Sequence, residues 1–174
     1  MSTAQPSNQP ALARRSAEAE LRRLIVKFAL AHQRLIGAVR RRLRERLPTA
    51  HEVVYEYSDC LVISYSPDER GYEGVLALRA NTDGVRLYLQ RGRGLPDPAK
   101  LLRGSGTQAR WMHLEDASTL ARPEVAGLLD AAIARTRVPF ARTGRGPVVL
   151  RSVPAKQRRR GKKGRQRRAG VDGG

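Results

Sequence analysis

Hydrophobic positions recur at spacings of three and four through the first third of the chain. Between residues 11 and 47 this apolar stripe consists of Leu21, Leu24, Ile25, Phe28, Leu35, Ile36, Val39, Leu43 and Leu47. The spacing keeps one face of a 3.6-residue period apolar, which predicts a long amphipathic helix. Gly37 could weaken or divide this helix. Pro48 should end it, because proline disfavours helical geometry in the residue before it.

The next part of the chain contains shorter runs that are rich in β-branched and aromatic residues. Such runs, bounded by turn residues, predict strands, and they cover residues 51–57, 60–65, 74–79, 85–90 and 108–115. The second run is almost entirely apolar, as expected of a strand inside a sheet. An Asp-Gly step at positions 83 and 84 predicts a hairpin. After that hairpin, alternating side chains predict a strand with one buried and one solvent-facing side.

A last helix is predicted over residues 122–136, with Pro123 in its first turn. The order of helix, strands and helix predicts an α+β fold of two layers. In this fold a long N-terminal helix and a C-terminal helix flank a mostly antiparallel sheet of four to five strands. We expect a disordered leader over residues 1–10, one α+β domain over 11–137, and a Pro- and Gly-containing linker with a tail over 138–174. A short strand at 148–150 could extend the sheet.

The net charge of +18 is unevenly distributed. Residues 156–168 read KQRRRGKKGRQRR, so nine of these thirteen residues are basic. A run of this density repels itself on a folded surface and buries too little apolar area to offset the entropy of ordering. The sequence therefore predicts a disordered, strongly basic C-terminal tail.

A polyanion is the natural partner of such a tail, because each neutralised phosphate releases condensed counterions. The candidate nucleic-acid-binding residues are Lys156, Arg158, Arg159, Arg160, Lys162, Lys163, Arg165, Arg167 and Arg168. No aromatic residue is interleaved with them, so the tail should contact the backbone without sequence specificity. An anionic membrane, an acidic protein and a purely solubilising role are the alternatives.

A second basic group lies near the end of the first predicted helix and consists of Arg40, Arg41, Arg42, Arg44 and Arg46. Arginine near a helix C-terminus interacts favourably with the helix dipole. The simplest interpretation is a solvated helix face. If this face lies beside the point where the tail leaves the domain, the two would form one positive surface.

Composition narrows the remaining possibilities. Cys60 is the single cysteine, which excludes an intramolecular disulfide and a cysteine-based zinc site. It begins an apolar run, and we expect it to be buried and inert. No run reaches the roughly 18 apolar residues of a membrane span, and the N-terminus lacks the features of a secretory signal. We expect a cytoplasmic protein with no cofactor, more readily a binding module than an enzyme.

Two groups of residues could still carry chemistry. The loop over residues 92–106 could form an anion nest around its Gly-Ser-Gly step, with Lys100 and Arg103 adding charge. It does not have the Walker spacing, and a structural turn is the simpler interpretation.

Carboxylates at Glu52, Glu56 and Asp59 could attract a metal ion, although solvated carboxylates are the simpler interpretation. His32 lies on the apolar stripe and is expected to be a packed core or boundary residue. Trp111, the only tryptophan, is expected to pack in the core.

Three segments carry a family resemblance: HEVVYEYSDCLVISYSP (51–67), LPDPAKLLRGSGTQAR (95–110) and LEDASTLARPEVAGLLDAAIA (114–134). Through them, residues 20–135 resemble the YdhG-like family of domains of unknown function, which implies a compact α+β fold. Some members are described as frataxin-like iron chaperones for iron–sulfur assembly, a role that calls for an acidic surface. In this basic chain the local acidity is limited to Glu52, Glu56, Asp59, Asp68 and Glu69. Thr107 stands where the family has lysine.

Three functional hypotheses follow from these patterns. The first is a non-enzymatic YdhG-like domain that a basic tail tethers to nucleic acid. The second is a frataxin-like iron-handling protein. The third is a small-ligand-binding domain with a pocket under the loop 92–106, lined by Tyr55, Tyr65, Arg86 or Arg110.

Overall fold

The computed structural model describes residues 9–151, and the side chains from residue 12 onward. Two helices come first, α1 (Gln9–Ile25) and α2 (Leu30–Arg46). The strands are β1 (His51–Glu56), β2 (Leu61–Ser66), β3 (Leu76–Asn81), β4 (Gly84–Leu89), β5 (Arg110–Leu114) and β6 (Val148–Arg151). A 3-10 helix, η1 (Ala117–Ala121), and helix α3 (Pro123–Ala134) separate β5 from β6. No helix within residues 9–151 is long and apolar enough to cross a membrane.

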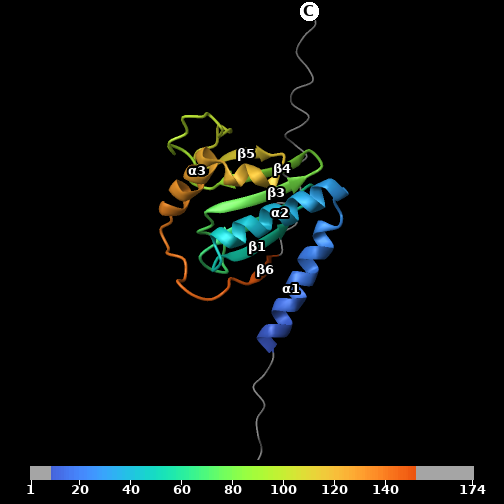
Figure 1. Ribbon diagram of the computed structural model, residues 1–174. Coiled ribbons are helices and arrows are strands. Elements are labelled where there is room, and N and C mark those ends of the chain that lie inside the picture. The colour runs from blue at the N-terminus through green and yellow to red at the C-terminus, as the bar shows by residue number, and fades with distance from the viewer. Residues whose placement is uncertain (1–8, 152–174) are drawn as a thin grey trace, which may run out of the picture.

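The strands form one six-stranded sheet in the order β5-β4-β3-β2-β1-β6. Strands β1 to β5 are an antiparallel meander, and β6 pairs in parallel with β1. Helices α2 and α3 lie on one side of the sheet, and α1 runs beside its β6 edge (Figure 1). The predicted α+β class and two-layer arrangement are confirmed.

The N-terminal helical region differs from the prediction, because it forms two helices instead of one. The break falls at residues 26–29, while Gly37 lies inside α2. A single helix over residues 11–47 would be about 55 Å long, far longer than strands of about 20 Å. Folding back lets Leu24 of α1 and Val39 of α2 reach the same core. The amide of Gln33 stabilises the turn by donating to the carbonyls of Val26 and Phe28, at 3.3 and 2.8 Å.

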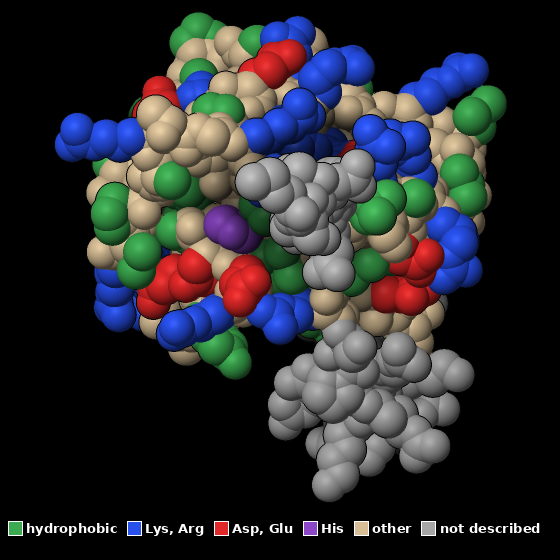
Figure 2. Space-filling model, turned by 90° about the horizontal axis from the view of Figure 1, so that it is seen from below, with side chains coloured by type: hydrophobic (Ala, Val, Ile, Leu, Met, Phe, Trp, Pro, Cys, Tyr) green, Lys and Arg blue, Asp and Glu red, His purple; other side chains and the backbone are tan. Residues whose placement is uncertain are grey.

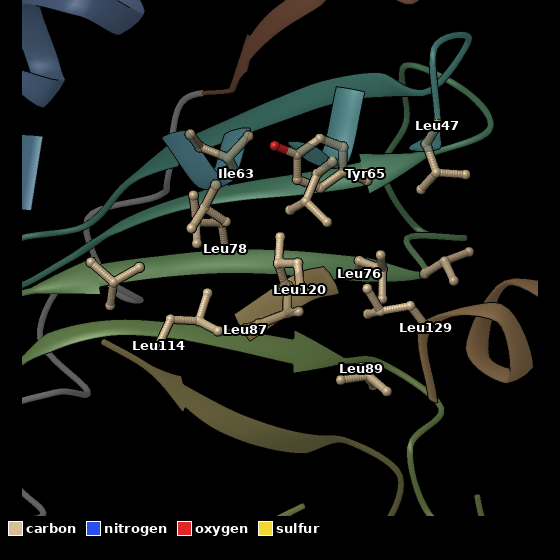
Figure 3. Packing of buried hydrophobic residues seen from close by; sticks show 14 of the residues in the cluster. Leu47, Ile63, Tyr65, Leu76, Leu78, Leu87, Leu89, Leu114, Leu120 and Leu129 are labelled. Carbon is tan, nitrogen blue, oxygen red and sulfur yellow. The ribbon is translucent and has the colours of Figure 1, made fainter. Parts of the chain in front are cut away.

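The hydrophobic core fills the space between the sheet and the helices (Figure 3). Alternate residues of the strands point into it, including Ile63, Leu78 and Leu87, which are direct cross-strand neighbours. Leu43 of α2 and Leu129 of α3 close this layer from the helix side, and both are fully buried. At roughly 1.5–3 kcal/mol for each large apolar side chain removed from water, this cluster accounts for most of the stability of the fold.

The C-terminal boundary of the folded body lies beyond residue 137. The optional strand at 148–150 is present as β6, and it pairs with β1 through the register Glu52 to Val148. Residues 138–147 therefore connect α3 to the opposite edge of the sheet instead of leading directly into a tail. Gly146 anchors this connection by donating its backbone N–H to the carbonyl of Pro48, at 3.0 Å.

Candidate functional site

Arginines from both N-terminal helices line a groove at the β6 edge of the molecule. Two adjoining hollows, of about 840 and 430 Å³, share Glu18, Arg22, Arg44 and Arg145 in their walls. The other arginines that line them are Arg14, Arg15, Arg40 and Arg41. On the face seen in Figure 2, Lys and Arg side chains gather around a hollow.

A buried ionic cluster forms the floor of this groove. Arg40 donates two hydrogen bonds to Glu52, at 2.8 and 2.7 Å, and two to Glu18, both at 2.7 Å. Glu52 is only 1% exposed, and its other partners are Tyr65, whose hydroxyl lies 3.2 Å away, and Arg44 at 3.0 Å. Burying an ion pair costs several kcal/mol of desolvation, which only close geometry and extra hydrogen bonds offset.

Hydrogen bonds within this cluster shift the pKa values of Glu18 and Arg40. The hydrogen bonds from Arg40 hold the pKa of Glu18 below its ordinary value of 4.5. Burial alone would lower the pKa of Arg40, but its hydrogen bonds with Glu18 and Glu52 raise it above its ordinary value. The lowered pKa favours the ionised form of Glu18, and both acids in the floor are paired with arginines from inside the fold. The prediction that Arg40 belongs to a solvated helix face is wrong, because its side chain is 12% exposed.

The remaining arginines of the groove keep their charge available to a ligand. Within the described part of the chain, Arg15, Arg22, Arg41 and Arg145 form no salt bridge, and all four are exposed. Arg145 directly precedes Gly146, whose backbone packs against Thr49 and Ala50 in the connection between α2 and β1. A Cβ atom at Gly146 would lie 1.8 Å from the carbonyl oxygen of Ala50. The groove therefore presents fixed positive charge over a neutralised floor.

The side of the sheet opposite the core is a second candidate surface. No helix of the described region covers it, and residues 67–75 fold over one end of it. There Gly71 packs against Val53 and the hydroxyl of Tyr55, Gly74 packs against Ser64, and Arg151 donates a hydrogen bond to the carbonyl of Glu69. Cross-strand register aligns one row of side chains across all six strands: Arg151, Tyr55, Val62, Arg79, Arg86 and His113. Tyr88 and Trp111 are paired in the neighbouring row. We call these eight residues the open face.

Trp111 lies on the open face, so the prediction that it packs in the core is wrong. In β5 the core positions are Met112 and Leu114, because Met112 pairs with the buried Leu87. The guanidinium of Arg86 sits 4.6 Å from the centroid of the Trp111 ring, and the Tyr88 ring centroid is 6.4 Å away. Trp111 and Met112 are adjacent apolar residues in β5, so the sequence alone does not show which of the two faces the core.

The carboxylates proposed as metal ligands are each close to a cation. Glu52 belongs to the ionic cluster, Glu56 accepts a hydrogen bond from Lys27 at 2.6 Å, and Asp59 lies 3.8 Å from Arg79. Glu56 and Asp59 line a hollow of about 620 Å³ together with His32, Lys27 and Cys60. Within residues 9–151, His, Cys, Asp and Glu form no group of three or more that could hold a metal ion. Cys60 is buried as predicted, and burial raises the pKa of its thiol.

The loop over residues 92–106 is built around a carboxylate. Asp97 accepts hydrogen bonds from the backbone N–H groups of Leu101 and Leu102, at 2.9 and 2.8 Å. Gly104, with φ of 104°, packs against the pyrrole edge of Trp111, and Arg103 pairs with Trp111 through two backbone hydrogen bonds. The loop thus protects the outer edge of β5.

The pocket predicted under this loop does not bring its four side chains together. Tyr65 is fully buried in the core, whereas Tyr55 and Arg86 lie on the open face. Arg110 bonds to carbonyls of its own loop.

The predicted nucleic-acid-binding residues of the tail, from Lys156 to Arg168, lie outside the described residues. The sequence did point to Arg41 and Arg44 of the groove, but not to its contributors Arg14, Arg15, Arg22 and Arg145, which come from segments far apart in the chain.

Comparison with known proteins adds no assignment: no protein-family model matches the chain, and no curated protein or solved structure is significantly similar to it.

Proposed function

We propose that this chain is a non-enzymatic, cytoplasmic nucleic-acid-binding protein, in which a YdhG-like α+β body and a basic tail both hold the phosphate backbone. The observation that carries the proposal is the groove between α1 and α2, where exposed arginines outnumber the acids and where Glu18 and Glu52 are already paired. Glu45 is the other acid in its lining. Guanidinium groups suit phosphate because their fixed donors bind two oxygens at once. Neither the groove nor the tail offers a means to read a sequence, so recognition rests on backbone charge.

The position of the groove also allows the groove and the tail to bind the same nucleic acid. Its lining includes Pro147 and Val148 at the start of β6, and the described residues end at Arg151, the last residue of that strand. From Arg151 the first basic residue of the tail, Lys156, is five residues away, a reach of up to about 17 Å. The tail could therefore follow a nucleic acid that the groove holds.

The iron-handling alternative has less support than nucleic-acid binding. Two of its five candidate acids are already paired, Glu52 with Arg40 inside the fold and Glu56 with Lys27. Anaerobic titration with ferrous iron is the direct test of that alternative. Saturable binding that substitution of Glu56 weakens would support it.

Charge reversal tests the groove. We expect Arg22→Glu together with Arg145→Glu to weaken binding to DNA and RNA of any sequence, and to reduce the slope of log affinity against log salt by about one for each lost phosphate contact. The matched control is Arg122→Glu with Arg137→Glu, two exposed arginines away from the groove. Removing residues 155–174 should reduce the slope further. Equal slopes for the groove variant, the control and the unmodified protein would refute the role of the groove.

A further inference from the structure

The open face combines cations and aromatic rings in an arrangement that packing alone does not explain. Arg79 and Arg86 are direct cross-strand partners, and like charges in that position destabilise a sheet. Asp59 is the only acid within 4.0 Å of either guanidinium in the described region, and it lies 3.8 Å from Arg79. The Nε atoms of Arg79 and Arg86 are buried without a hydrogen-bond partner among the described residues. Arg79 also interacts with Tyr88 and Cys60, and Arg86 lies over Trp111. The two guanidinium groups thus have one acid beside them, and the face keeps a net positive charge.

Aromatic rings flank these arginines on both sides. Tyr55 and Tyr57 stack with ring centroids 6.4 Å apart, and Tyr88 and Trp111 lie at the same separation on the other side. Tyr57, Arg79 and Tyr88 together line a shallow hollow of about 330 Å³. The row from Arg151 to His113 crosses five strand spacings, which corresponds to about 24 Å. The rings are half-buried, so they are held in place while part of each remains accessible.

We propose that the open face binds single-stranded nucleic acid by stacking its unpaired bases on these side chains. Aromatic rings and guanidinium planes stack on any base, and neighbouring arginines neutralise the phosphates. In a duplex the bases are already stacked on one another, so we expect the open face to bind a duplex more weakly than a single strand. This inference rests on the proposed function and specifies it, because it names the form of nucleic acid that the folded body prefers.

Charge argues against the other possible occupants. The basic tail of this chain would be repelled by Arg79, Arg86 and Arg151. A second copy of the chain, packed face to face, would bring arginine rows toward one another. A polyanion with planar groups neutralises the positive charge and can also stack on the aromatic rings.

Trp111 gives a direct signal for the test, since it is the only tryptophan in the chain and lies on the open face. The full-length protein is titrated with a thymidine oligonucleotide of about 12 nucleotides, within the usual site size of such proteins. An abasic oligonucleotide of the same length and a duplex are titrated in parallel. We expect the thymidine oligonucleotide to quench tryptophan fluorescence, and the other two to bind without quenching. Anisotropy of a labelled strand measures binding itself.

Single substitutions then show whether a loss of binding comes from lost stacking or from unfolding. Tyr88→Ala should weaken binding of the thymidine oligonucleotide by about tenfold, whereas Tyr88→Phe should retain it because the ring remains. Arg86→Gln should also weaken binding, and Arg122→Gln, which is exposed on the other side of the body, should not. Circular dichroism confirms that each variant is folded.

The outcomes distinguish this inference from the proposed function. Equal quenching by abasic and thymidine strands, or equal affinity of Tyr88→Ala and Tyr88→Phe, would overturn stacking on the open face. If strands bind with steep salt dependence but leave Trp111 unquenched, the groove proposal stands and the open face is not the site. If neither the strands nor the duplex binds, both proposals fail.

Discussion

At the scale of single residues, the ionic cluster around Arg40 is the feature with the largest energetic consequence. Its guanidinium bonds both Glu52 inside the fold and Glu18 at its boundary, and Arg44 supplies the second positive charge. A buried charge that loses its partner is far more costly than an exposed one, because it cannot regain water without opening the core. Arg40 therefore holds α1, α2 and β1 together, and it does so beneath the groove.

We expect Arg40→Met to lower the free energy of unfolding by about 3 kcal/mol, since Glu52 would remain buried with only Arg44 beside it. Arg42→Met, on the exposed side of the same helix, should change it by no more than about 0.5 kcal/mol. Urea denaturation followed by circular dichroism measures both. Equal losses in the two variants would mean that the cluster contributes nothing beyond an ordinary surface charge.

At the scale of elements, the connection into β6 depends on one glycine. Gly146 lies against the backbone of Thr49 and Ala50, and rigid backbone cannot move aside as a side chain can. Gly37 is the contrasting case, because it lies in the middle of α2 with open space around it.

Alanine at these two positions should have opposite effects. Gly146→Ala should destabilise the protein by about 1–3 kcal/mol through overpacking. Gly37→Ala should stabilise it by up to about 1 kcal/mol, because alanine favours the helix. Thermal denaturation shows both shifts, and a stabilising Gly146→Ala would contradict the close packing of Gly146 against Thr49 and Ala50.

The elements also show what sequence patterns can and cannot predict. Turn residues and the pattern of apolar and polar side chains were sufficient to predict β2, β3 and β4 and the hairpin that joins β3 to β4. The stripe in residues 11–47 keeps one phase through both α1 and α2, so periodicity carries no sign of the break, which sheet dimensions impose. In β1, Val53 and Val54 are both apolar, so alternation could not show that Glu52 points inward. The cross-strand row of the open face depends on register, which no local pattern contains.

At the scale of the whole molecule, residues 138–151 decide whether the sheet is complete. Without β6, the outer edge of β1 would expose unpaired backbone groups, and exposed edges promote association with other chains. The groove would also lose Arg145.

A chain that ends at residue 137 should therefore unfold at a lower temperature than one that ends at residue 154, and it should aggregate more readily. Thermal denaturation and size-exclusion chromatography of the two shortened proteins provide the comparison. Identical stability and elution would show that β6 is dispensable.

The pairing of β6 with β1 also sets an order of events during folding. The antiparallel strands β1 to β5 join neighbours along the chain, whereas β6 pairs with a strand about 96 residues earlier. Contacts between distant residues form slowly because a long loop must close first. During synthesis strands β1 to β5 can pair with one another before β6 pairs with β1. The final strand of the body therefore completes its edge last.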